Sequence, residues 1–149
     1  MKKVFTILLF FIIASTLTAC SVITDNILEI NKKEIVKKID NISIFFDRDS
    51  YYVNNHYSSL IEDIAIFLSK NHNVKVILNG YADTMGSSEY NIALGQRRAN
   101  SVYEIMRILG VANNQLEVVS FGKEKFHKST DTLEKNMAKN RRVDILILN

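Results

Sequence analysis

Apolar residues recur with two different periods between residues 42 and 148. Four stretches alternate apolar with polar side chains or are almost wholly apolar, which is typical of β-strands; they cover residues 42–46, 74–79, 116–121 and 143–148. Two longer stretches repeat apolar residues with the period of an α-helix, at 56–70 and 89–109, and a short helical segment is expected at 133–140. This order predicts an α+β domain in which two main helices pack against one sheet.

The first nineteen residues have the pattern of a signal peptide. Lys2 and Lys3 precede an apolar run at 4–14 that is broken only by Thr6. With about 11 residues the run is too short to span a membrane, which takes roughly 20. We therefore expect residues 1–19 to be removed from the mature chain.

The end of this leader, Leu17-Thr18-Ala19-Cys20, resembles the lipobox of bacterial lipoproteins. The resemblance implies that Cys20 is acylated and becomes the first mature residue, and Ser21 after it favours the outer membrane. Each buried acyl methylene contributes about 0.8 kcal/mol, so two or three chains would hold the protein firmly. The alternative is an ordinary signal peptide with an incidental cysteine. Residues 20–40 are expected to be a tether, with a docked helix as the competing interpretation, and 41–149 to be the domain.

Composition narrows the classes of partner and activity. The 149 residues and 17.1 kDa fit one domain. The formal charge is +3, and removal of the leader takes two lysines with it and leaves 17 basic and 16 acidic side chains, so nucleic acid is not an expected partner. The three histidines lie far apart and Cys20 is the only cysteine, so we expect no metal site, no cofactor and no catalysis.

The loop and helix after Gly80 carry the clearest motif in the chain. Their residues match a family pattern at Asp83, Gly86, Asn91, Leu94, Arg98, Ala99 and Val102. Together with the segments 44–47, 119–124 and 140–144, this motif resembles the OmpA-like peptidoglycan-binding domain over residues 42–148. The resemblance implies a two-layer sandwich of about four strands in a mixed sheet, with the two main helices on one face. A domain of this kind behind an acylated cysteine is similar in layout to the lipoproteins of the Tol system.

The chemistry of the motif suits a zwitterionic ligand. Asn91 and Arg98 are seven residues apart, about two helical turns, and share one helix face, while Asp83 lies in the loop that enters this helix. A carboxylate, a guanidinium and the N–H groups of a helix start suit an ammonium and a carboxylate on one carbon. In the family that ligand is the diaminopimelate of the peptidoglycan stem peptide. The resemblance implies that Asp83 takes its ammonium and Arg98 its carboxylate, and that Thr84, Asn91, Asp49 and Arg142 complete the site.

Some positions depart from the family pattern or allow another interpretation. The family usually has Gly-His-Thr-Asp where this chain has Gly80-Tyr81-Ala82-Asp83, which predicts altered surroundings of Asp83 with binding retained. The run Asn140-Arg141-Arg142 is also consistent with a solvated basic surface. Tyr51, Tyr52, Tyr57 and Tyr90 are interpreted as packing at the rim of the domain rather than as a platform for sugars.

These observations predict a noncatalytic outer-membrane lipoprotein whose domain faces the periplasm. It is expected to bind peptidoglycan noncovalently and so to tether the outer membrane to the cell wall. The alternative is an OmpA-like lipoprotein subunit of an envelope-spanning assembly, such as a secretion or Tol-like complex, that acts mainly through protein contacts.

Overall fold

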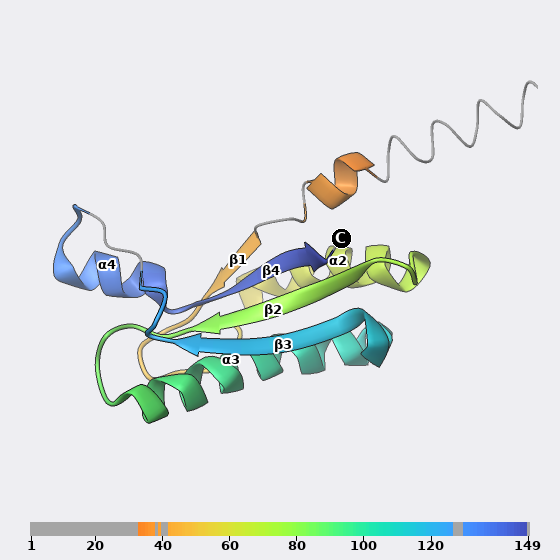
Figure 1. Ribbon diagram of the computed structural model, residues 1–149. Helices are drawn as coiled ribbons and strands as arrows, with labels where there is room; N and C mark the ends of the chain where they lie inside the picture. Colours follow the sequence, from red (N-terminus) through yellow and green to blue (C-terminus); the bar gives the residue numbers. More distant parts are fainter. Residues whose placement is uncertain (1–32, 38, 40–41, 127–129, 149) are drawn as a thin grey trace, which may run out of the picture. The chain divides into compact units, whose positions relative to one another are not determined.

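Two separate units contain the residues that the computed structural model describes, which are 33–37, 39, 42–126 and 130–148. Residues 33–37 belong to the first unit and are helical. The second unit begins at Ile39 and contains the labelled strands and helices (Figure 1). The expected signal peptide, Cys20 and most of the expected tether lie outside the described residues. Among the helices that are described, none is long and apolar enough to cross a bilayer.

The second unit is built on a four-stranded mixed sheet with the strand order β1-β4-β2-β3. Its strands are β1 (Ile42–Phe45), β2 (Lys75–Tyr81), β3 (Leu116–Gly122) and β4 (Arg142–Leu148). The pair β2 and β3 is parallel, whereas β4 runs antiparallel to both β1 and β2. The carboxyl ends of β1 and β2 therefore meet at the edge of the sheet where β4 begins.

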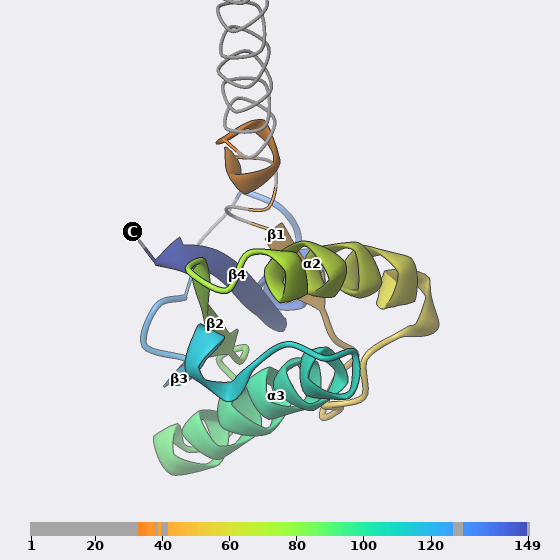
Figure 2. The ribbon, with the colours of Figure 1, turned by 90° about the vertical axis from the view of Figure 1, so that its right-hand side faces the viewer.

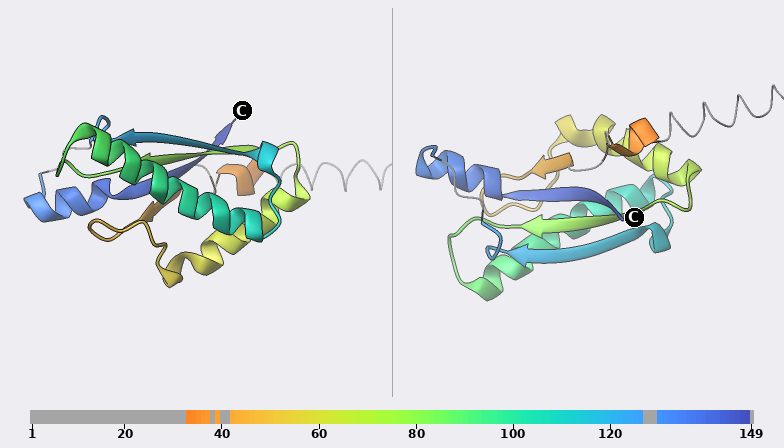
Figure 3. Two further views of the ribbon diagram at one scale, coloured as in Figure 1. Left: turned by 90° about the horizontal axis from the view of Figure 1, so that it is seen from below. Right: turned by 45° about the horizontal axis from the view of Figure 1, so that its top comes forward.

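Both main helices cover the same face of this sheet (Figure 2). They are α2 (Ser58–Lys70) and α3 (Ser88–Ile108); the 3-10 helices η1 (Asn55–Tyr57) and η2 (Asn113–Gln115) each precede the next main element. The short helix α4 (Leu133–Asn140) lies beyond the end of the sheet and leads into β4 (Figure 3). The predicted α+β sandwich with two helices on one face is confirmed.

Alternation along the strands sends one set of apolar side chains into the layer between sheet and helices. The sheet and the helices each supply fully buried side chains to this core, namely Ile44, Val76, Leu78, Val143 and Ile145 from the sheet and Ile61, Ile64, Leu68, Val102 and Met106 from the helices. Helix α3 approaches β2 most closely at two glycines: a Cβ on Gly80 would lie 2.0 Å from the carbonyl oxygen of Gly95. This close approach fixes the height of α3 above the carboxyl end of β2.

The loop between β2 and α3 is closed by a cap. Ser87 is the N-cap of α3, and its hydroxyl accepts a hydrogen bond from the Tyr90 N–H at 3.2 Å. A serine oxygen in this position satisfies one of the unpaired N–H groups of the first helical turn. The loop 82–87 is thus held at both ends, by β2 and by the start of α3.

Candidate functional site

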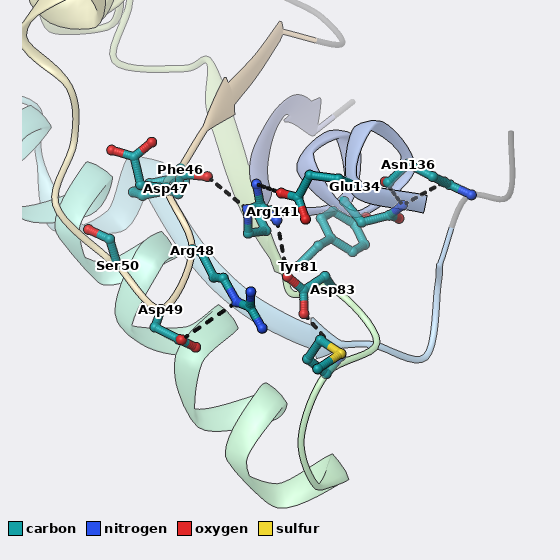
Figure 4. Close-up of polar contacts among 12 residues, drawn as sticks. Phe46, Asp47, Arg48, Asp49, Ser50, Tyr81, Asp83, Glu134, Asn136 and Arg141 are labelled. Carbon is teal, nitrogen blue, oxygen red and sulfur yellow. Dashed lines mark hydrogen bonds and ion pairs between the residues drawn. The ribbon is translucent and has the colours of Figure 1, made fainter. Parts of the chain in front are cut away.

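Asp83 lies in this loop, two residues beyond the end of β2, and only 7% of it is exposed. Its Oδ1 accepts a hydrogen bond from the Met85 N–H at 3.0 Å, and its Oδ2 accepts one from Nη1 of Arg141 at 3.3 Å. Figure 4 shows the ion pair between this carboxylate and Arg141. The two contacts fix the orientation of Asp83 and keep its charge compensated in a poorly solvated place.

Arg141, which joins α4 to β4, is the cation that the structure brings to Asp83. It is 7% exposed and also donates to Oε1 of Glu134 at 3.1 Å and to the carbonyl oxygen of Phe46 at 3.3 Å (Figure 4). A solvated basic run is therefore the wrong interpretation for Arg141. The available signal was the alternation of β4, since Arg141 falls on the same side as the buried Val143.

Arg98 is almost completely buried, at 1% exposure, and its donors point to backbone carbonyls. Its Nε donates to Ser50 at 2.8 Å, Nη1 to Tyr81 at 2.9 Å and Nη2 to Asp47 at 3.1 Å. Burial lowers the pKa of Arg98 to about 10; the nearby carboxylate of Asp83 opposes this shift, and the charge of Arg141 adds to it. Arg98 remains charged at neutral pH and ties the loop after β1 to the end of β2.

The amide of Asn91 supports the loop that carries Asp83. Asn91 is buried on the first turns of α3, and its Nδ2 donates to the carbonyl oxygen of Met85 at 2.8 Å. Met85 therefore links Asn91 to Asp83, because its carbonyl accepts from the Asn91 amide and its N–H donates to the Asp83 carboxylate. The predicted sharing of one helix face by Asn91 and Arg98 holds, but each makes its hydrogen bonds to backbone.

Thr84 and Asp49 are both exposed at the border of the site. Asp49 has a left-handed backbone conformation with φ of 54°, and its Oδ1 accepts a hydrogen bond from the Tyr90 hydroxyl at 3.3 Å. Its carboxylate also lies 4.0 Å from Nε of Arg48 (Figure 4). Both side chains are open to solvent beside the buried Asp83.

Arg142 lies on the opposite face of the sheet, because alternation along β4 separates it from Val143 and Arg141. Its Nε donates to both carboxylate oxygens of Asp144, at 2.9 and 3.1 Å, and its guanidinium lies 4.1 Å from the centre of the Tyr81 ring. The expectation that Arg142 completes the site around Asp83 is not met by this geometry. Its neighbour Arg141 takes that place.

Tyr81 stands where the family usually has histidine, and it too faces away from Asp83. Its ring stacks with Phe121 at 5.4 Å between ring centres and lies beneath Arg142. The departure from the family pattern thus changes the face of the sheet opposite α2 and α3, where Tyr81 and Arg142 are buried against each other. Asp83 keeps hydrogen bonds that do not involve the side chain of Tyr81.

Residues 45–141 match the OmpA family. The chain belongs to this family. It is 34% identical over 122 residues to the peptidoglycan-associated lipoprotein of Buchnera aphidicola subsp. Baizongia pistaciae, a match that covers 81% of this chain and 70% of that protein. The protein of the same name from Legionella pneumophila is 38% identical over 101 residues, which are 68% of this chain and 57% of the relative. The crystal structure of the peptidoglycan-associated lipoprotein from Burkholderia pseudomallei matches with a TM-score of 0.68 at 40% identity, over 71% of this chain and 89% of that one.

The OmpA-family match contains every residue of the site just described. Asp83, Asn91, Arg98 and Arg141 all fall between residues 45 and 141. The resemblance inferred from the motif after Gly80 is confirmed by the match and by the similar fold. The described part of this OmpA-family chain has no group of three or more side chains arranged to hold a metal ion.

Proposed function

We propose that this OmpA-family protein is a noncatalytic outer-membrane lipoprotein that binds peptidoglycan through Asp83 and its surroundings in the loop between β2 and α3. The relatives named peptidoglycan-associated lipoprotein support the ligand class. The geometry of Asp83 carries the proposal. Its carboxylate lies in the loop that follows β2, is nine-tenths buried and is oriented by two hydrogen-bond donors. Such a group binds a ligand ammonium strongly because water competes poorly for it.

The ligand we assign is the free end of diaminopimelate, which carries an ammonium and a carboxylate on one carbon. Asp83 binds the ammonium through the lone pairs that Met85 and Arg141 leave unused. Arg98 has five N–H donors, of which three bind carbonyl groups, and the other two serve the ligand carboxylate. Thr84 and Asp49 stand at the rim, where an entering ligand meets hydroxyl and carboxylate groups.

The sharpest test of this site is Asp83→Asn, which keeps the shape of the side chain and removes its charge. Full-length protein in mild detergent is incubated with isolated sacculi and sedimented. We expect the variant to lose at least about thirtyfold in affinity, because truncating one partner of a buried charged contact costs about 2–5 kcal/mol. Asp63→Asn, an exposed position on α2, is the matched control and should sediment like the wild type.

Equal retention of wild type and Asp83→Asn would refute this site. Because the substitution also removes the charge paired with Arg141, urea unfolding of the variant must show that it is still folded under the binding conditions before a loss of retention is assigned to the site. Free diaminopimelate provides a second readout: it should release the wild-type protein from sacculi. Arg98→Ala is less informative, because Arg98 also holds two loops together.

We further propose that Cys20 carries the lipid that anchors the protein in the outer membrane, with the domain in the periplasm. The sequence Leu17-Thr18-Ala19-Cys20 supports this assignment. Cys20→Ala should move the protein from the outer-membrane fraction to the soluble periplasmic fraction and remove the acyl mass from the mature chain. A mass difference that corresponds only to the exchange of the side chain would exclude acylation at Cys20.

A further inference from the structure

The loop between β1 and η1 carries a prominent aromatic ridge formed by Tyr51 and Tyr52. Tyr52 is 74% exposed, and its ring stacks on that of Tyr51 with 4.8 Å between centres and 28° between planes. Packing at the rim is therefore the wrong interpretation for Tyr52. A large aromatic ring that is held by a neighbour and left in solvent is a common feature of binding surfaces.

Hollows lie on both sides of this ridge. Tyr52 lines one of about 330 Å³ together with Tyr57 and Arg141, and another of about 540 Å³ together with Tyr51 and Arg97. Both are open to solvent rather than enclosed, so they suit a segment of an extended polymer and not a buried small molecule. Tyr52 thus stands between two depressions of the same surface.

The larger hollow combines aromatic rings with polar side chains of the outer face of α3. The Arg97 guanidinium lies 5.9 Å from the centre of the Tyr51 ring. Further along the helix, Asn100, Ser101 and Glu104 line the same hollow. Val53 and Ile105 complete the lining, and most of its accessible surface is apolar. Aromatic and apolar surface bordered by an amide, a hydroxyl and one side chain of each charge suits a neutral sugar that packs by its apolar face and has hydroxyl or acetamido groups at its edge. The single positive and single negative charge argue against a polyanion.

The ridge is connected to the site at Asp83 through Arg98. Nε of Arg98 donates to the carbonyl oxygen of Ser50, the residue immediately before Tyr51. Arg97, the neighbour of Arg98 on α3, lines the larger hollow on the exposed side of the helix. One short stretch of α3 therefore contributes to both surfaces. Tyr52 also lines the smaller hollow together with Arg141, the ion-pair partner of Asp83.

We propose that the Tyr51–Tyr52 ridge and the hollow beside Arg97 bind the glycan strand of peptidoglycan, with the apolar face of an N-acetylated sugar packed on Tyr52. This inference rests on the proposed function, because it assigns a second contact with the same polymer. The stem peptide is bound at Asp83, and the sugar to which that peptide is attached is bound at the ridge. The hollow supplies Arg97, Asn100 and Glu104 as hydrogen-bond partners for hydroxyl and acetamido groups.

The test separates the two contacts by using two probes. Glycan strands that are freed of stem peptides by an amidase, and whose exposed lactyl carboxylates are then converted to methylamides so that the probe is neutral, report on the ridge; free diaminopimelate reports on Asp83. With full-length protein in mild detergent, Tyr52→Ala should weaken binding of the peptide-free glycan by about three- to tenfold, which is the effect of losing one aromatic contact. Tyr52→Phe, which keeps the ring, and Ile108→Ala, an exposed position elsewhere on α3, should bind like the wild type.

Diaminopimelate binding should be unchanged in Tyr52→Ala, and this separates the inference from the proposed function. If the wild type binds diaminopimelate but Tyr52→Ala binds peptide-free glycan as well as the wild type does, the ridge assignment fails and the function stands. If diaminopimelate does not bind the wild type, the proposed function itself fails. If Tyr52→Ala loses only crosslinks to an envelope protein and keeps glycan binding, the ridge contacts protein and the inference is overturned.

Discussion

Asp83 and Arg141, which are 58 positions apart in the chain, form an ion pair of 3.3 Å in which each side chain is about nine-tenths buried. The pair joins the loop after β2 to the start of β4. Because neither charged group is well solvated, removing one partner leaves the other buried without compensation for its lost hydration. The pair therefore has a structural role in addition to the role proposed for Asp83 in binding.

Arg141→Ala is predicted to lower the free energy of unfolding by about 3–5 kcal/mol, because Asp83 would remain buried without its cation. Glu134→Gln, which affects the other carboxylate partner of Arg141, is predicted to cost less than about 1 kcal/mol, since the Glu134 side chain is 66% exposed. Urea unfolding of both variants measures the difference. Similar losses in the two variants would mean that burial does not set the strength of these contacts.

Arg98→Ala is predicted to cost about 3–5 kcal/mol, because one buried and two part-buried backbone carbonyls lose their donor and a cavity forms. Arg98→Lys should cost less but should still be destabilising, since a single ammonium cannot reproduce the fork that reaches Asp47, Ser50 and Tyr81. The urea midpoint together with the slope of the transition provides the measurement. A fully stable Arg98→Ala would show that these carbonyls find other donors.

Gly80→Ala is predicted to destabilise the domain by about 3 kcal/mol, because the new Cβ would lie 2.0 Å from the carbonyl oxygen of Gly95 and would push α3 away from β2. Gly110→Ala is the control: a Cβ there meets no atom within 4 Å, and only the φ of 94° opposes it, at a cost of about 1 kcal/mol. Thermal unfolding of the two variants measures the contrast. Equal shifts in Tm would contradict the close approach of helix and strand.

The acid side of the stability profile is predicted to depend on Glu89. Hydrogen bonds from its own backbone N–H and from Ser87, and the charge of Lys123, lower the pKa of Glu89 below 4.5. A lowered pKa in the folded state means that Glu89 stabilises the fold above pH 4.5 and that this contribution is lost as the pH falls through the folded-state value. Urea unfolding between about pH 3 and pH 7 should show Glu89→Gln less stable than the wild type near neutrality and equal to it at the acid end. A constant difference across this range would refute the assignment.

The fold was predictable because its elements follow the periods of their apolar residues. The strand expected at 116–121 is observed at Leu116–Gly122, and the helix expected at 89–109 at Ser88–Ile108. The short segment expected at 133–140 forms α4 with these same bounds. Burial of one face is a local property of the sequence, and it therefore identifies elements without any knowledge of their partners.

The pairing within the site was less predictable because it depends on contacts between distant segments. The motif located Asp83 and Arg98, but it did not show that Arg98 binds carbonyl groups of a loop about fifty residues away. Nor did it distinguish Arg141 from Arg142, which differ by one position and therefore face opposite sides of β4. The exposure of Tyr52 depends on the path of the loop between β1 and η1. A loop has no regular repeat of apolar residues from which the exposure of its side chains could be predicted.

The direction of β1 determines how the domain would carry a mechanical load between membrane and wall. A pull on the amino-terminal side passes the buried Ile39, where the domain begins, and reaches β1 at Ile42. The proposed wall contact at Asp83 lies near the other end of β1, where β2 also ends. Force would therefore run along the strands, and the ladder from Ile42–Ile145 to Phe45–Arg142 would be loaded in shear. In shear all its hydrogen bonds resist together, whereas a pull across the strands would break them one after another. The strand order thus suits a domain that must stay folded while a pulling force acts between its amino-terminal end and its ligand.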